Sequence, residues 1–181
     1  GVVTALKEGK ATITATVAGK TATKVVTVEE ISITEVALNP AAKTVDLKEG
    51  TVTLEILQST EKNETTTDKI TSTTWASSNT EVATVKDGVV TLKAAGTTTI
   101  TVTVKTDAGT EFTADSVITV EIPVTGIKVT QDGKDVTNTS IGLLKGNSIT
   151  LGAEIVPANT SDQYQITWES SDPASVTVVN G

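Results

Sequence analysis

Two groups of acidic residues have types and spacing that could support chemistry. Glu29 and Glu30 are adjacent, and Asp132 and Asp135 lie within the segment QDGKD. Paired carboxylates can act as acid and base on a glycosidic bond, and their oxygens can contribute to a calcium site, which needs about six or more ligands. Nothing in the pattern places them in a cleft, and the spacing is not that of an EF-hand. We expect no catalytic or cofactor-binding residue, and calcium at these four residues stays an open alternative.

Composition removes several other kinds of site. The 181 residues contain no cysteine, histidine or methionine, which excludes disulfides, thiolate or imidazole metal ligands and histidine-based triads within them. The net charge of −8 argues against nucleic acid as a partner, because phosphates require a basic surface. No apolar run approaches the roughly 18 residues of a membrane span.

The two tryptophans could stack on a carbohydrate or pack in a core. Trp75 and Trp168 each precede the same short motif, Ser-Ser-Asn or Ser-Ser-Asp, on an apolar strand. This equivalent placement favours packing between two sheets. Phe112 and Tyr164 are isolated, and no stacking platform can be built from them. An isopeptide cross-link in a chain without cysteine also stays open, although most lysines lie at turns.

The sequence repeats itself. Residues 75–104 match 168–181 over their first part and 1–17 over their second, so Gly1, Gly88 and Gly181 occupy the same site in three successive copies. Spacings of this length indicate domains rather than solenoid units of about 20–50 residues. We expect the C-terminal strands of a first repeat at 1–30, a complete domain at 31–122, and the N-terminal strands of a third repeat at 123–181.

Threonine alternating with valine or isoleucine predicts strands with one buried face. The fold class expected is all-β, with tandem immunoglobulin-like β-sandwiches, one complete and two partial and complementary. Asp87-Gly88 and Asn180-Gly181 fit two-residue type I′ turns, and a longer loop with the glycine in a bulge is the alternative. The polar segment 59–68 is expected to be an exposed loop, with 157–165 as its counterpart. The strands predicted in the complete repeat are 32–38, 44–48, 51–57, 70–76, 82–86, 89–94, 98–106 and 113–122.

The motif order resembles a known family. Trp75-Ala-Ser-Ser-Asn79, Val82 to Val85, Gly88 to Thr91 and Gly96 to Val102 together resemble the bacterial Ig-like group 2 (BIG2) domain. The resemblance implies a bacterial extracellular module, used as a tandem spacer in surface-layer proteins, adhesins and secreted polysaccharide enzymes. We therefore expect a non-enzymatic structural repeat at the cell surface. The alternatives are an adhesin stalk, whose ligand is bound by other domains, and an accessory module of a polysaccharide-active enzyme.

The two end pieces predict assembly. Each piece alone would leave a core face and sheet edges unpaired, which favours pairing with neighbouring copies or adjacent repeats, head to tail. A cell-wall or host-surface glycan is a further possible partner. The opening residues Val2 and Val3 read as part of a strand. The strands expected to form the assembly contact contain Val2, Val3, Leu6, Val176, Val178 and Val179.

Overall fold

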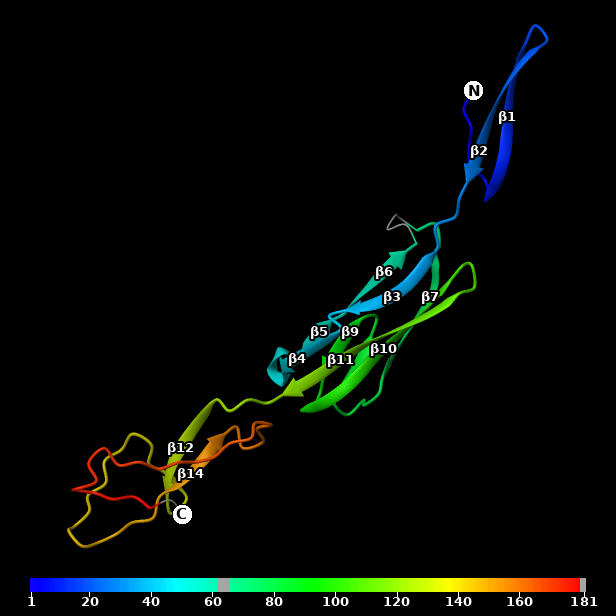
Figure 1. Ribbon diagram of the computed structural model, residues 1–181. Helices are drawn as coiled ribbons and strands as arrows, with labels where there is room; N and C mark the ends of the chain where they lie inside the picture. The colour runs from blue at the N-terminus through cyan, green and yellow to red at the C-terminus, as the bar shows by residue number, and fades with distance from the viewer. Residues whose placement is uncertain (62–65, 180–181) are drawn as a thin grey trace.

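Nearly all of the regular secondary structure of the protein is β-strand. The computed structural model describes residues 1–61 and 66–179, in which the single helical element is a 3-10 turn at Leu47–Glu49. A two-stranded hairpin lies at one end of the chain, a sandwich in the middle and a three-stranded sheet at the other end (Figure 1). No helix in the described part of the chain is long and apolar enough to span a membrane.

The strands follow the alternation of apolar and threonine residues. They are β1 (Gly9–Val17), β2 (Lys20–Val28), β3 (Ile33–Asn39), β4 (Ala42–Asp46), β5 (Thr51–Thr53), β6 (Glu55–Thr60), β7 (Ile70–Ser77), β8 (Ala83–Lys86), β9 (Val89–Leu92), β10 (Gly96–Thr106), β11 (Glu111–Glu121), β12 (Gly126–Gln131), β13 (Lys134–Asp135) and β14 (Gly152–Val156).

The central sandwich comprises β3 to β11. One layer has the strand order β4-β11-β10-β7, and the other consists of the pair β3-β6 and the sheet β5-β9-β8. All of these pairs are antiparallel except β4 with β11, which is parallel. The expected all-β sandwich is therefore confirmed.

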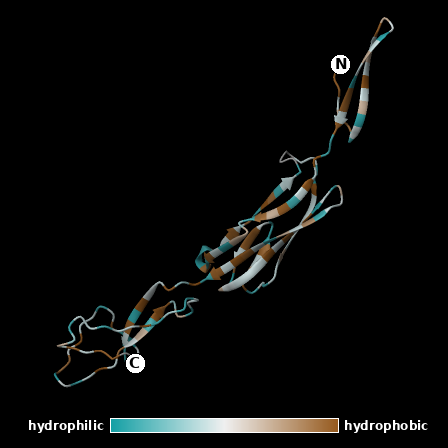
Figure 2. Ribbon diagram, viewed as in Figure 1, coloured by the Kyte–Doolittle hydropathy of each residue, from teal (hydrophilic) through white to brown (hydrophobic). Residues whose placement is uncertain are grey.

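The core lies between these layers. On β10, Ile100, Val102 and Val104 are fully buried, because their side chains alternate with threonines on the opposite face. Figure 2 shows apolar residues along the strands of the central sandwich. The core consists of Ile33, Val36, Leu38, Val45, Val52, Leu54, Val82, Ala83, Val90, Leu92, Ile100, Val102, Val104, Ile118 and Val120.

A buried hydroxyl explains the Ser-Ser-Asn motif. Thr98 is 1% exposed, and its Oγ1 lies 2.9 Å from Ser77 Oγ and 3.3 Å from Ser78 Oγ. The backbone N–H of Asn79 donates to the same oxygen at 3.0 Å. The motif therefore connects the end of β7 to β10, and it supplies hydrogen-bond partners to the buried Thr98 hydroxyl.

The end sheets bury almost nothing. Among the described residues outside 31–122, only Thr130 is buried. The sheet formed by β1 and β2 has no third strand in the described residues, and β12 pairs with β13 on one side and β14 on the other. The β1–β2 hairpin differs in this respect from the β10–β11 hairpin of the central sandwich, where β7 pairs with the free edge of β10.

The structure corrects several of the expected strands. Residues 1–6 and 163–179 contain no strand, because neither segment has a hydrogen-bonding partner strand. The single strand expected at 51–57 changes sheets at Leu54, whose N–H donates to the Gly88 carbonyl at 2.8 Å. The strand expected at 44–48 ends at Asp46, where a 3-10 turn begins.

The type I′ turn expected at Asp87-Gly88 is confirmed. Both residues have positive φ, and the paired residues Lys86 and Val89 flank them. The matching turn expected at Asn180-Gly181 lies outside the described residues.

Candidate functional site: two junction clasps

A short side-chain cluster holds the chain where it enters the central sandwich. Ile31 lies between β2 and β3, and Ile33 is the first residue of β3. Both backbone polar groups of Ile31 form hydrogen bonds with the segment before β7. The Thr67 N–H donates to the Ile31 carbonyl at 2.9 Å, the Thr66 hydroxyl donates to it at 2.8 Å, and the Ile31 N–H donates to Thr67 Oγ1 at 3.1 Å. The Ile33 N–H donates to Asp68 Oδ2 at 2.9 Å. We call Thr66, Thr67 and Asp68 the first clasp.

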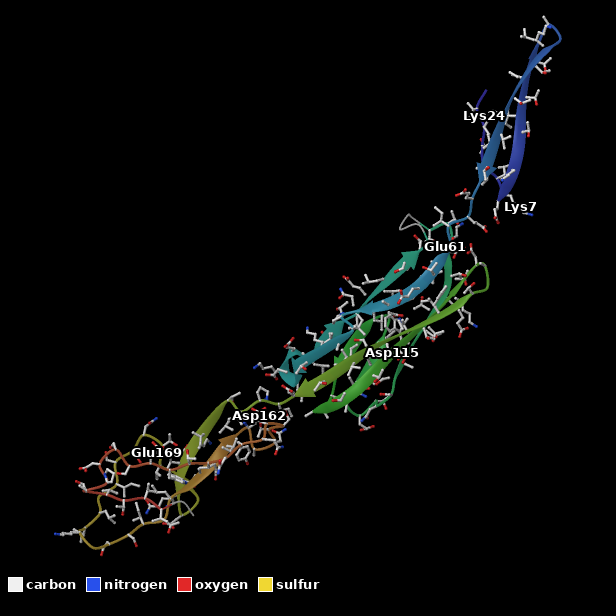
Figure 3. The ribbon with its side chains drawn as sticks, viewed as in Figure 1. Lys7, Lys24, Glu61, Asp115, Asp162 and Glu169 are labelled. Carbon is white, nitrogen blue, oxygen red and sulfur yellow. The ribbon has the colours of Figure 1, made fainter. Side chains whose placement is uncertain are left out.

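The same arrangement recurs where the chain leaves the sandwich. The Ser161 N–H and the Thr160 hydroxyl donate to the Ile122 carbonyl at 2.8 and 2.6 Å. The Ile122 N–H donates to Ser161 Oγ at 2.8 Å, and the Val124 N–H donates to Asp162 Oδ2 at 2.8 Å. We call Thr160, Ser161 and Asp162 the second clasp; Figure 3 labels Asp162 at this junction.

Each clasp also organises itself. The N–H of Asp68 donates to Thr66 Oγ1 at 3.0 Å, and the N–H of Asp162 donates to Thr160 Oγ1 at 3.1 Å. These short-range hydrogen bonds hold the carboxylate in the orientation in which it accepts the backbone N–H of Ile33 or Val124. A carboxylate that accepts a backbone N–H forms a stronger bond than a neutral acceptor does. The first clasp therefore fixes the backbone of its junction to the segment before β7, and the second clasp fixes that of its junction to the segment after β14.

An open groove of about 350 Å³ lies beside the second junction. One wall comes from the 3-10 turn of the central sandwich, where Asp46 caps the turn by accepting the Lys48 N–H at 2.9 Å. The same carboxylate pairs with the Lys48 ammonium at 2.7 Å, which holds the pKa of Asp46 below its usual value. The groove is lined by Asp46, Leu47, Lys48, Ile122, Pro123, Thr125, Pro157 and Asn159.

The four acidic residues considered for calcium lie in different places. Asp132 has positive φ in the turn between β12 and β13, and Asp135 follows on β13. The Thr137 hydroxyl and N–H hold the pKa of Asp135 below its usual value. Glu29 and Glu30 are exposed after β2. Within residues 1–61 and 66–179, no three acidic side chains form a group that could hold a metal ion.

The tryptophans differ in surroundings. Trp75 is half-buried and packs against the core, and its ring lies 3.4 Å from the position that a Cβ on Gly88 would occupy. Trp168 is half-buried in a segment without strands. Phe112 packs against the core, whereas Tyr164 is 56% exposed.

The residues expected to form assembly strands are all exposed. Val2 and Leu6 are more than nine-tenths exposed, and Val179 is 88% exposed. The structure contains one chain, so the pairing of these residues with a neighbour stays a prediction. The full set is Val2, Val3, Leu6, Val176, Val178 and Val179.

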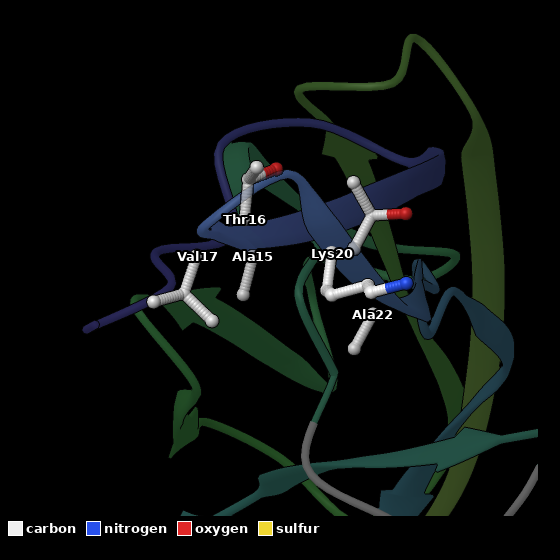
Figure 4. A pocket seen from close by; sticks show the side chains of 6 residues that line it. Ala15, Thr16, Val17, Lys20 and Ala22 are labelled. Atoms are coloured by element: carbon white, nitrogen blue, oxygen red, sulfur yellow. The ribbon is translucent and has the colours of Figure 1, made fainter.

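The β1–β2 hairpin has an open apolar face at its tip. A groove of about 230 Å³ is lined there by residues 15–17 and 20–22. In Figure 4 the side chains of Ala15, Val17 and Ala22 point to one side of the hairpin, and Thr16 points to the other. Val17 is 76% exposed, so this face is uncovered in the chain.

Sequence reasoning missed both clasps. The segment 59–68 was expected to be an exposed loop, and residues 62–65 of it lie outside the described residues. Its last three residues instead form hydrogen bonds with the backbone of the first junction. A signal was present, since Thr-Thr-Asp and Thr-Ser-Asp occur seven and six residues before the two tryptophans. Their partners Ile33 and Val124 lie 35 and 38 residues away in the sequence.

Comparison with known proteins identifies part of the sandwich. Residues 65–106 match the family model described as intimin, immunoglobulin-like domain, which covers less than half of the chain. Among solved structures, domains 4–9 of the surface layer protein SbsC are similar, with 22% identity and a TM-score of 0.49. The similarity covers 84% of this chain and 24% of that one, so the chain spans about a quarter of its length. No curated protein sequence matches.

Proposed function

We propose that this chain is a non-catalytic structural repeat of a bacterial extracellular surface protein, of the BIG2 type, in which successive sandwiches are held at fixed orientations. The observation that carries the proposal is the recurrence of the clasp. Both junctions have the same hydrogen bonds to the same backbone groups, although the segments that supply them differ in sequence. A spacer needs stiff junctions, and the immunoglobulin-like match at 65–106 agrees with such a module.

A stalk in an adhesin is the second candidate. The family that matches residues 65–106 is named for intimin, which favours this use over an accessory module of an enzyme. In a stalk, these junctions would hold a binding domain, not present in the chain, away from the cell. Saturable binding of this chain to a glycan array would instead assign recognition to the repeat itself.

The junction stiffness can be tested by distance measurements between spin labels. Because the chain has no cysteine, labels can be placed at Lys86→Cys and Lys134→Cys, two exposed positions on either side of the second clasp. We expect a narrow distance distribution that broadens in Asp162→Ala. Asp172→Ala, an exposed aspartate outside the clasp, should leave the distribution unchanged. A broad distribution in the parent chain, or no effect of Asp162→Ala, would refute the proposal.

A further inference from the structure

The strand β7 lies at the end of its sheet, which has the order β4-β11-β10-β7. The N–H of Ser78 donates to the Thr99 carbonyl on β10 at 2.9 Å. Backbone groups alternate in direction along an antiparallel strand, so those of Thr74 also point to β10, whereas those of Thr73 and Trp75 point away from it. No strand pairs with this second edge of β7 in the described part of the chain.

This edge lacks the features that usually prevent an exposed strand from pairing. Natural edge strands are short or carry charged residues or proline. Among the other strands at sheet ends of the central sandwich, β5 has three residues, and β3, β4, β6 and β8 each contain at least one charged residue. By contrast, β7 has eight residues and contains no charged residue, proline or glycine. Its one irregularity is Thr71, which lies out of register with β10, so the regular edge runs from Ser72 to Ser77.

We propose that two copies of this chain associate side by side through this edge of β7, antiparallel, about a two-fold axis at Thr74. Thr73 of each copy then forms backbone hydrogen bonds with Trp75 of the other, and the two four-stranded sheets join into one continuous sheet. The contact is isologous, because both copies use the same strand, and it closes as a dimer. It is a lateral contact, distinct from head-to-tail pairing.

The sequence of β7 is self-complementary in this register. On the outward face, Thr74 meets Thr74 of the second copy, and Ser72 meets Ala76. On the inward face, Thr73 meets Trp75 of the second copy, whose ring is half-buried against its own core. Threonine pairs and pairs of an aromatic with a β-branched residue stabilise antiparallel strands, and no like charges meet. Each side chain of the regular edge up to Ala76 therefore has a compatible partner.

Charge favours a second copy at this edge. The net charge of −8 makes whole chains repel one another, so two copies approach most easily where the surface is neutral. β7 has no charge, and the outward residues of β10 beside it are threonines as far as Lys105. Lys105 is paired with Glu111 at 2.9 Å. The end of the β8–β9 hairpin, beside Trp75, has one charge of each sign, on Lys86 and Asp87.

Cysteine cross-linking tests the register directly, because the chain has no cysteine of its own. Thr74→Cys would place two cysteines in a non-hydrogen-bonded pair with Cα atoms about 4.5 Å apart, a separation that a disulfide can span. Thr113→Cys is the matched control: Thr113 is also exposed, but it lies on β11, two strands further in, so its two copies would be about 24 Å apart. On mild oxidation, Thr74→Cys should form a disulfide-linked dimer and Thr113→Cys should not. Equal yields of dimer, or none from either variant, would overturn the proposal.

Association in solution supplies the second test. Thr73→Lys places a charge on the free edge and, by symmetry, removes two Thr73–Trp75 pairs, so the dissociation constant of the dimer in sedimentation velocity should rise about tenfold. Thr113→Lys makes the same change of charge at an exposed position away from the edge and should leave the constant nearly unchanged. Both variants should unfold at the temperature of the parent chain, because both threonines are exposed. A parent chain that stays monomeric at about 0.1 mM, or equal effects of the two variants, would refute the pairing. The contact is lateral, so its failure would leave the proposed stiffness of the junctions untouched.

Discussion

Removal of the Asp68 carboxylate should destabilise the central sandwich. In Asp68→Ala, the N–H of Ile33 loses its acceptor at 2.9 Å, and Ile33 is 4% exposed, so water does not readily replace the carboxylate. A buried donor without a partner costs about 1–3 kcal/mol. At the second clasp, Val124 is 37% exposed, and Asp162→Ala should therefore cost about 1 kcal/mol or less of local stability.

The difference can be measured by calorimetry. For a cooperative unit of about 60–100 residues, 1 kcal/mol shifts the Tm by roughly 4–8 °C, so Asp68→Ala should lower the main transition by about 4–24 °C. Asp162→Ala should leave this transition almost unchanged, because Asp162 lies outside the buried core. Asp68→Asn keeps an acceptor oxygen and should lose less stability than Asp68→Ala does.

Amide hydrogen exchange identifies the cause. If the clasp acts as described, the Ile33 amide exchanges faster in Asp68→Ala than in the parent chain, and Asp162→Ala leaves it unchanged. An unchanged Tm together with an unchanged Ile33 amide in Asp68→Ala would refute the reasoning. Equal losses of Tm in the two alanine variants would refute the assigned role of burial.

Three further predictions use neighbouring features. Gly96→Ala should destabilise the sandwich by about 1–3 kcal/mol in denaturant unfolding, because φ is +143° and the new Cβ would lie 2.8 Å from a Val82 methyl; Gly9 has the same φ but lies on β1, outside the sandwich, and Gly9→Ala should not change that transition. Thr98→Val removes the hydroxyl that binds the Ser-Ser-Asn motif and should cost about 1–3 kcal/mol in the same assay. For Asp135, the folded-state pKa lies below the usual 3.8, so its stabilisation is fully present above that value and is lost as pH falls through the lower folded-state pKa. Protection of the Thr137 amide, which donates to Asp135, against hydrogen exchange should therefore be constant at neutral pH and fall in acid. Asp135→Asn should remove this pH dependence. Protection that does not depend on pH in the parent chain would contradict the prediction.

The strands of the central sandwich could be predicted because their signal is local. Alternation of threonine with valine or isoleucine along β10 defines its buried face within a few residues. The type I′ turn at Asp87-Gly88 is local in the same way, since two residues with positive φ suffice. Val2 and Val3 have the composition of a strand but form none, because a strand also requires a partner that the local sequence does not specify.

The clasp motif recurs visibly before each tryptophan, but its role could not be predicted, because the backbone groups that it binds are distant in the sequence. Thr66, Thr67 and Asp68 have the composition of a solvated loop, and their significance depends on backbone groups 35 or 36 residues away. The switch of sheets at Leu54 has the same origin, since its partner is the Gly88 carbonyl. Sequence periodicity specifies which residues are buried, whereas it does not specify which backbone group each polar side chain reaches.

The parallel pairing of β4 with β11 has a mechanical consequence. The first junction leads into β3 and then into β4, and β11 ends next to the second junction. Tension along the chain therefore pulls the two neighbouring strands in opposite directions, and the five residue pairs from Ala42–Val117 to Asp46–Glu121 are loaded in shear at the same time. A hairpin such as β8–β9, pulled from its open end, would instead release its pairs one by one. Extension of the sandwich from one junction to the next thus requires all five pairs to break together.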